Sequence, residues 1–210
     1  MKTKLLLYCT KGKSSLNLWR AIGIKEDVHK AILSISEYQE DTELDDFMNV
    51  EFVKKYPKYA GERIIFRPTN LNGKIVAECE CEVEEISCKI GSPFPYLEFE
   101  HELPKTCLTE EELENYLNYK VGYALHLTNI KAFEKPLDLK ECKTYKKFYN
   151  SKNTYNIVEK VLTNAPQNAM WVWYKGQKYC LISIRPEWLC KILNGEKTIE
   201  VRRKILKGMM

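Results

Sequence analysis

The segment from Tyr179 to Arg202 constrains the fold most strongly, because it encodes three elements joined by tight turns. Tyr179–Ile184 is an apolar run with the length of a buried strand. Pro186 suits the first position of a helix. The apolar residues that follow fall on one helical face: Trp188, Leu189, Ile192 and Leu193. Asn194-Gly195 then ends this helix, and the residues after it alternate as a second strand, which favours an α+β fold.

Other parts of the chain also have the pattern of short strands separated by turns. The predicted strands are Lys4–Thr10, Lys74–Ile86, Gly122–Leu127, Met170–Tyr174, Tyr179–Ile184 and Lys197–Arg202. In Lys74–Ile86 the apolar residues alternate with acidic ones, which is typical of a strand with one face in water. Lys175 to Lys178 is expected to be a turn. We predict a mixed β-barrel with short flanking helices.

Helices are expected in two places besides the C-terminal one. Thr109 and Glu112 form a capping box that predicts a helix beginning at residue 110. Residues 25–60 have apolar residues at helical spacing. The two faces comprise Val28, Ile32 and Ile35, and Leu44, Phe47, Met48, Phe52 and Tyr56. Residues 87–105 contain three prolines and are expected to be a long loop.

Composition indicates a cytoplasmic protein that does not enter a membrane. No apolar run approaches the roughly 20 residues needed to cross a bilayer, and no signal peptide is predicted. The 8 cysteines have no CxxC pair and no His-rich partner, so no metal site is expected. Cys79 and Cys81 would face the same side of a strand and pack there as small, reduced hydrophobes.

Positive charge gathers near the C-terminus. Residues 185–207 hold seven Lys and Arg against three Glu, a net charge of +4, which equals that of the whole chain. Because the remaining residues therefore sum to zero, this cluster suits a polyanion site on a neutral body. A solvated charged face is the alternative interpretation.

The charged residues of the last strand have distinct chemistries. Arg202 offers a planar fork for a phosphate or a base edge. Lys197 is a point charge that can act as a general base when it is desolvated. Alternation places Thr198, Glu200 and Arg202 on one open face and Lys197 on the other. No motif requires a cofactor.

The run Gly195-x-Lys197-x-x-Glu200-x-Arg202 matches the GxKxxExR signature of the ASCH family, of the PUA-like superfamily, at every defined position. The strand, helix and turn before it also resemble that family's opening segment. Further segments that resemble the family are 6–12, 72–78, 109–119, 122–127, 136–139 and 165–167, the last followed by Trp171. The resemblance implies a single PUA-like domain over residues 1–210. Residues 14–70 then form a helical insertion and residues 143–163 a polar one.

The family's segments occur here in rotated order, since its first segment is the last of this chain. A circular permutation explains the order, and so would a second, truncated copy beginning at Tyr179. We favour the permutation because residues 1–178 contain no GxKxxExR run. It predicts that Met1 and Met210 lie close together and that the strand at residues 4–10 pairs within the same barrel.

The resemblance implies a pocket that binds RNA or a modified nucleobase, with DNA as an alternative. The candidate binding residues are Arg185, Gly195, Lys197, Thr198, Arg202, Tyr8, Lys11, Lys13 and Gln167. Some family members resemble ribonucleases, and others are amidohydrolases of N4-acylated cytidine. In the amidohydrolases a Thr stands three residues after the Lys. Glu200 occupies that place here, which counts against the amidohydrolase mechanism.

Three functional hypotheses remain open from the sequence. Binding of RNA or a modified nucleotide is the first. The second is a hydrolase in which Lys197 and Glu200 act with His126 or Ser183. The third is a viral or mobile-element interaction protein without catalysis. Trp171, Trp173 and Tyr174 could stack on bases, although core packing is the simpler interpretation. The sequence gives no basis for an oligomeric state.

Overall fold

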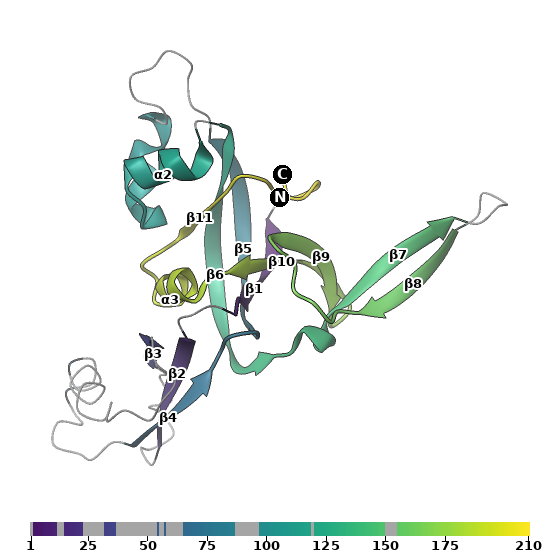
Figure 1. The fold of residues 1–210 in the computed structure, drawn as a ribbon, viewed down its shortest axis with the longest axis horizontal. Helices are drawn as coiled ribbons and strands as arrows, with labels where there is room; N and C mark the ends of the chain where they lie inside the picture. Colours follow the sequence, from purple (N-terminus) through teal and green to yellow (C-terminus); the bar gives the residue numbers. More distant parts are fainter. Residues whose placement is uncertain are drawn as a thin grey trace.

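The computed structural model describes residues 2–11, 15–22, 32–36, 54, 57, 65–86, 97–118, 120–149 and 155–210. Its main feature is a mixed sheet of eight strands in the order β11-β6-β5-β1-β10-β9-β7-β8 (Figure 1). These strands are β1 (Thr3–Cys9), β5 (Ile75–Ile86), β6 (Gly122–Leu137), β7 (Lys143–Tyr149), β8 (Tyr155–Val161), β9 (Ala169–Tyr174), β10 (Gln177–Ile184) and β11 (Ile199–Arg202). The predicted α+β class, rich in strands, is confirmed.

Strand β1 lies in the middle of this sheet. It runs parallel to β10 and antiparallel to β5. Leu5, Leu7 and Cys9 pack into the core on one face of the sheet, and Leu6 and Tyr8 pack into the core on the other. A strand that is buried on both faces needs a continuous apolar run, which explains why residues 5–9 are almost uniformly apolar.

The β5 strand shows the alternation that the sequence predicts. Cys79 and Cys81 are both buried in the same core cluster, as expected for two residues on one face. The cysteines that the structure describes are all free, and burial raises the pKa of Cys81 to about 11 and that of Cys9 to about 12. At neutral pH these buried thiols are therefore protonated and act as packing groups.

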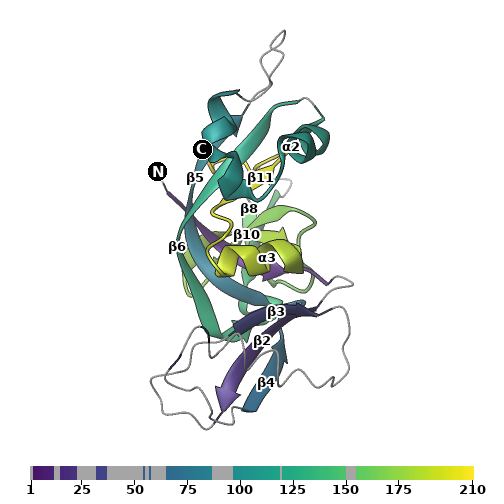
Figure 2. The ribbon, with the colours of Figure 1, turned by 90° about the vertical axis from the view of Figure 1, so that its left-hand side faces the viewer.

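Short helices flank the main sheet in the described part of the chain. They include η3 (Leu97–Thr106), α2 (Glu110–Leu117), η4 (Leu139–Glu141) and α3 (Pro186–Leu193). Figure 2 shows α3 lying within the curve of β5 and β6. Helix α3 inserts Leu189 and Ile192 into the core cluster that also contains Leu5 and Leu7. The helix predicted after Arg185 is thus confirmed.

The capping box predicted for α2 is formed by both of its hydrogen bonds. The Glu112 backbone N–H donates to the Thr109 hydroxyl, and the Thr109 backbone N–H donates to the Glu112 carboxylate. Leu113 and Leu117 turn inward and lie in one core cluster with residues of β11. The helix therefore covers the end of the sheet at which β11 lies.

A second sheet of three strands occupies part of residues 14–70. It has the order β3-β2-β4 and comprises β2 (Ser15–Ile22), β3 (Ile32–Ser36) and β4 (Ile65–Asn70). The helix expected over residues 25–60 is wrong at Ile32 and Ile35, because both lie in β3, where β-branched residues suit a paired strand. Val28 and the second predicted face, from Leu44 to Tyr56, lie outside the described residues.

Two further expectations need correction. Residues 97–106 form η3, although 87–105 was expected to be a loop, and residues 87–96 lie outside the described part. The strand predicted to end at Leu127 continues to Leu137 as β6. In both cases pairing or packing with distant residues extends order into sequence with weak local signals. The segment 143–163, expected to be a polar insertion, contains the antiparallel strands β7 and β8.

The two ends of the chain lie side by side (Figure 1). The Thr3 hydroxyl donates a hydrogen bond of 3.3 Å to the Met209 carbonyl oxygen. The expected proximity of the ends and the placement of β1 inside the main sheet are confirmed, although Met1 itself lies outside the described residues. Within the described part, no helix has the length and apolar character needed to traverse a bilayer.

We expect Gly122→Ala to destabilise the protein by about 1–3 kcal/mol, because a side chain here overpacks the contact between β6 and α2. A Cβ atom at Gly122 would lie 2.5 Å from Leu117 Cδ2 and 2.8 Å from its Cδ1. Urea unfolding followed by circular dichroism measures the effect. Thr128→Ala, at an exposed position of the same strand, is the control. Equal midpoints for the two variants would contradict this close contact.

Candidate functional site

The candidate site begins at the turn between α3 and β11. Gly195 has a φ of +80°, a left-handed conformation that glycine adopts without a steric penalty. The backbone N–H groups of Glu196 and Lys197 both donate to the Lys191 carbonyl oxygen, at 2.9 and 3.1 Å. These bonds close the end of the helix and fix the backbone from which the Lys197 side chain extends. The glycine of the signature therefore has a clear backbone role.

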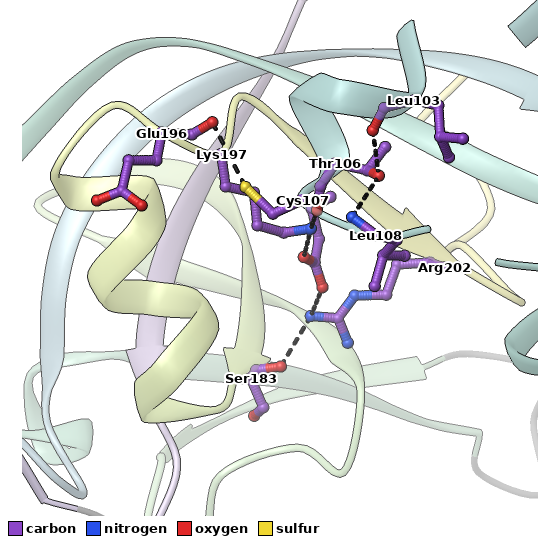
Figure 3. Close-up of polar contacts among 9 residues, drawn as sticks. Leu103, Thr106, Cys107, Leu108, Ser183, Glu196, Lys197 and Arg202 are labelled. Carbon is purple, nitrogen blue, oxygen red and sulfur yellow. Dashed lines mark hydrogen bonds and ion pairs between the residues drawn. The ribbon is translucent and has the colours of Figure 1, made fainter. Parts of the chain in front are cut away.

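Lys197 is buried, with only 2% of its surface exposed. Its Nζ donates a hydrogen bond of 2.6 Å to the Thr106 carbonyl oxygen and lies 3.4 Å from Glu200 Oε2 (Figure 3). The centroid of the Trp188 ring lies 5.1 Å from the same Nζ. A carbonyl oxygen, a carboxylate and an aromatic ring therefore surround the amine.

Glu200 and Arg202 extend this network along β11. Glu200 is 9% exposed, and its Oε1 lies 3.0 Å from Arg202 Nη2. The same Nη2 donates a hydrogen bond of 2.8 Å to the Ser183 carbonyl oxygen of β10. Arg202 Nε is buried and has no hydrogen-bond partner among the described residues. One N–H donor of the guanidinium is thus left unused beside the Glu200 carboxylate.

The three charges form a chain in which Glu200 lies between two cations. Moving ions out of water costs several kcal/mol each, and their mutual attraction must offset that cost. Burial is the main cause that lowers the pKa of Lys197, while the Glu200 carboxylate acts in the opposite direction. A buried lysine with a lowered pKa next to a carboxylate can hold a ligand or exchange a proton.

The end of η3 covers this network. Thr106 is fully buried, and its hydroxyl donates to the Leu103 carbonyl oxygen and accepts from the Leu108 backbone N–H. Two more hydrogen bonds join this region to residues 195–198, which we call the signature turn. The Thr198 N–H donates to the Lys105 carbonyl, and Cys107 Sγ donates to the Glu196 carbonyl. Sequence reasoning missed these residues, because nothing in the spacing of residues 97–107 points to the turn.

Two expectations about the last strand are wrong. The face that carries Glu200 is closed rather than open, because Glu200 is buried within the fold. Lys197 does not point away from Glu200, since the regular strand begins only at Ile199 and strand alternation does not apply to the turn before it. Lys197, Glu200 and Arg202 therefore come together.

The side chains of three weaker candidates make no contact with this network within the described part. Thr198 is half-buried and is bonded through its backbone to Lys105 and Leu127. Gln167 is exposed, in a segment whose neighbouring carbonyls accept hydrogen bonds from Ser183. Arg185 is exposed at the start of α3, and its Nη1 lies 3.9 Å from Glu187 Oε1.

Two other candidate residues do not join the network, and one cannot be placed. Tyr8 is buried in the core cluster on the opposite face of the sheet from α3, so it packs rather than binds. Lys11 is exposed near Gly73 and, within the described part, makes no hydrogen bond or ion pair with the signature turn. Lys13 lies outside the described residues. The sequence position of Tyr8 in a strand does not reveal which face of the sheet it occupies.

The side chains considered as catalytic partners bond to other groups. His126 is half-buried and hydrogen-bonded to Glu84 at 2.8 Å, rather than to Lys197 or Glu200. Ser183 contributes its backbone carbonyl to Arg202, while its hydroxyl donates to the Pro166 carbonyl. Within the described ranges, no group of three or more His, Cys, Asp or Glu residues has an arrangement that could hold a metal ion.

In comparisons with known proteins, the chain matches no family model, no curated protein and no solved structure. The interpretation of the site therefore rests on its residues and their geometry.

We expect Lys197→Met to destabilise the protein by about 1–3 kcal/mol at neutral pH, because the Thr106 carbonyl and one Glu200 oxygen lose their donor. The difference from wild type should depend on pH. The folded pKa of Lys197 lies below the ordinary value of 10.5, so the folded state holds fewer protons than the unfolded state between those two values. Wild-type stability relative to the variant therefore rises with pH through that window.

Urea unfolding of both proteins from neutral pH up to 10.5, the ordinary lysine pKa, measures this difference. Lys131→Met, which removes an exposed lysine from β6, is the control variant. A constant stability gap between wild type and Lys197→Met would show that burial does not shift the pKa of the lysine.

Proposed function

We propose that this chain is an ASCH-type, PUA-like domain that binds RNA or a modified nucleobase at the turn carrying the GxKxxExR run. One observation carries the proposal: the three charged residues of that run, Lys197, Glu200 and Arg202, form one continuous chain of contacts inside the fold. Spacing along the sequence does not require these side chains to meet. Their convergence supports the interpretation of the run as a functional unit.

The same proposal has two further parts. The curved main sheet is assigned to the PUA-like barrels, and the order of its segments along the chain is rotated. The position of β1 between β5 and β10 supports a rotated chain, because the N-terminal strand is then an internal part of the sheet. The contact between Thr3 and Met209 supports it as well, since a permuted chain must bring its ends together.

The donors around the turn suit an anionic or carbonyl-bearing ligand. Lys197 and Arg202 bring two cations to one place, and Arg202 Nε has no acceptor there among the described residues. Further cations lie at the exposed surface. Arg185 stands at the start of α3, and the guanidinium carbon of Arg203 lies 4.8 Å from the centroid of the Tyr116 ring. Phosphates would contact these exposed groups, while a base edge would meet Arg202.

Entry of a base requires a rearrangement at η3. The Lys197 amine is buried and already donates to the Thr106 carbonyl oxygen. A carbonyl or phosphate oxygen of the ligand would replace that acceptor when the end of η3 moves aside. The Glu200 carboxylate would keep both cations in place during the exchange.

We expect the protein to bind labelled RNA with an affinity that weakens as salt is raised, because phosphate contacts release counterions. Lys197→Met/Arg202→Gln should bind about tenfold more weakly or worse, since it removes two cations from the site. Fluorescence anisotropy with single- and double-stranded RNA and DNA, at low and near-physiological salt, measures the affinities. Circular dichroism verifies that the variant is folded.

The matched control is Lys131→Gln/Lys135→Gln, which removes two exposed lysines from β6. If the control weakened RNA binding equally, only the net charge of the protein would matter. That result would contradict binding at the signature turn. Absence of binding to every probe at low salt would overturn binding of bare strands. A free modified nucleoside would then be tested by calorimetry.

Hydrolysis is the second candidate, and the lowered pKa of Lys197 beside Glu200 favours it. A neutral lysine amine can accept a proton from water or from a ribose hydroxyl. We expect any cleavage of RNA or of N4-acetylcytidine to be lost in Lys197→Met and kept in Lys131→Met, as measured by chromatography of the products. Equal turnover by the two variants would exclude Lys197 as the base.

A further inference from the structure

A strip of aromatic and lysine side chains crosses three strands of the main sheet. It consists of Trp171 and Trp173 of β9, Lys143 and Tyr145 of β7, and Lys178 of β10. We call these five residues the aromatic–lysine strip. In the described part of the chain, none of the contacts of the Lys197–Glu200–Arg202 network involves them, so the strip is a separate feature.

The strand register puts the strip on one face of the sheet. Trp173 is paired with Lys178 on one side and with Lys143 on the other, and paired residues project to the same side. Trp171 and Tyr145 are two positions away along their strands and therefore share that side. The contacts agree. Lys178 Nζ lies 4.1 Å from the Trp171 ring centroid, and the Tyr145 and Trp173 rings are 5.5 Å apart and nearly perpendicular.

The strip is well exposed for such large side chains. Trp173 is 38% exposed and Tyr145 is 44% exposed, so the sequence-based expectation that Trp173 packs in the core is wrong. Strand β9 pairs with β7, and the ribbon formed by β7 and β8 projects from the body of the protein (Figure 1). Exposed aromatic rings in a contiguous group mark binding surfaces more often than isolated ones do.

The charge of this region favours an anionic partner. Residues 143–178 contain seven Lys and one Glu, a net charge of +6, whereas the whole chain carries +4. The single carboxylate, Glu159, is occupied locally, because Lys143 Nζ lies 2.6 Å from Oε1 and the Tyr145 hydroxyl donates to Oε2. Lys178 is exposed on the face of the strip, and this segment has no second carboxylate to neutralise it. Lys146 and Lys160 are also exposed, but they lie on the other face of the ribbon, where they pair with Val158 and Thr144.

The strip is connected to the segment that follows the signature strand. Trp171 Nε1 donates a hydrogen bond of 3.2 Å to the Lys207 carbonyl oxygen. Trp171 and Trp188 both pack against the core cluster that lies under α3, so the strip and the Lys197 network share one face of the sheet. The four residues between Arg202 and Lys207 therefore link the network to the strip.

We propose that the aromatic–lysine strip is a binding track for single-stranded nucleic acid. Bases stack on the rings of Trp173 and Tyr145, and Lys178 contacts a phosphate beside them, while Lys143 stays paired with Glu159. Base stacking on aromatic residues combined with a basic groove is the usual physical basis of single-strand binding. The inference deepens the proposed function, since it assumes that the partner at the signature turn is a nucleic acid and extends its contacts along the sheet.

A protein partner would use other features of β7 and β8. Ile157 and Val158 of β8 are exposed on opposite faces of this strand pair, and a second protein chain would cover those aliphatic side chains or pair with the β8 backbone. The strip is instead made of rings and lysines, and binding to it should respond to salt. These differences separate the two kinds of partner experimentally.

The test measures the affinity of the whole chain for fluorescein-labelled oligouridylates and oligothymidylates of increasing length by anisotropy. The variants are Trp173→Ala and Lys178→Gln. Val158→Ala, on the opposite face of the β7–β8 ribbon, and Lys131→Gln, on β6, are their matched controls. We expect Trp173→Ala to weaken binding of the longer strands about tenfold, as for the loss of one stacked base. Lys178→Gln should reduce the salt dependence of binding, and both controls should bind like wild type.

Short strands that fill only the signature site should bind wild type and Trp173→Ala equally. Equal affinities of Trp173→Ala and Val158→Ala for long strands would overturn the inference. A loss of binding confined to Lys197→Met/Arg202→Gln would overturn it as well, but it would leave the proposed function intact. Loss in Trp173→Ala with full binding by Lys197→Met/Arg202→Gln would keep the track and overturn the signature site. Salt-independent self-association that is abolished by Val158→Ala, with no oligonucleotide binding, would overturn the track and identify a protein interface instead.

Discussion

The Glu200 carboxylate is the group on which the arrangement of the site depends. One oxygen contacts Arg202, which reaches the Ser183 carbonyl of β10. The other oxygen contacts Lys197, which reaches the Thr106 carbonyl at the end of η3. A single buried anion thus connects β11, β10, the signature turn and η3. Without it two cations would face each other away from water, and the protein would have to expose one of them or let Lys197 lose its proton.

The apolar core supplies the rigid frame around this anion. Strand β1 is buried on both faces and holds β10 in parallel register, so the Ser183 carbonyl has a fixed position. Helix α3 packs Leu189 and Ile192 onto the same core and is followed at once by the turn at Gly195, which fixes where the signature begins. The charged network therefore depends on packing, because packing sets the distances at which the charges interact.

Charge is distributed unevenly along the chain, and both proposed binding regions lie in its positively charged part. Residues 143–210 carry fourteen Lys and Arg against four Glu, a net charge of +10, while residues 1–142 carry a net charge of −6. The acidic part includes Glu80 and Glu82, which alternate with Cys79 and Cys81 and so point away from the face of the sheet that holds α3. A polyanion would be repelled from that side and drawn to the other, where the signature turn and the aromatic–lysine strip lie.

The sequence by itself determined the elements with strong periodic or capping signals: β1, β5, the capped helix α2, and the strand–helix–turn–strand segment that ends in Arg202. It also singled out Lys197, Glu200 and Arg202 as a set, through the resemblance of residues 195–202 to a GxKxxExR signature. Only the tertiary structure decided that Lys197 and Glu200 are buried, that Lys197 turns toward Glu200, and that Thr106 covers them, because burial depends on elements distant in the sequence. The same holds for β3 and for Trp173, since strand pairing with distant residues, rather than local spacing, decides whether such apolar residues lie in a helix, a core or an exposed face.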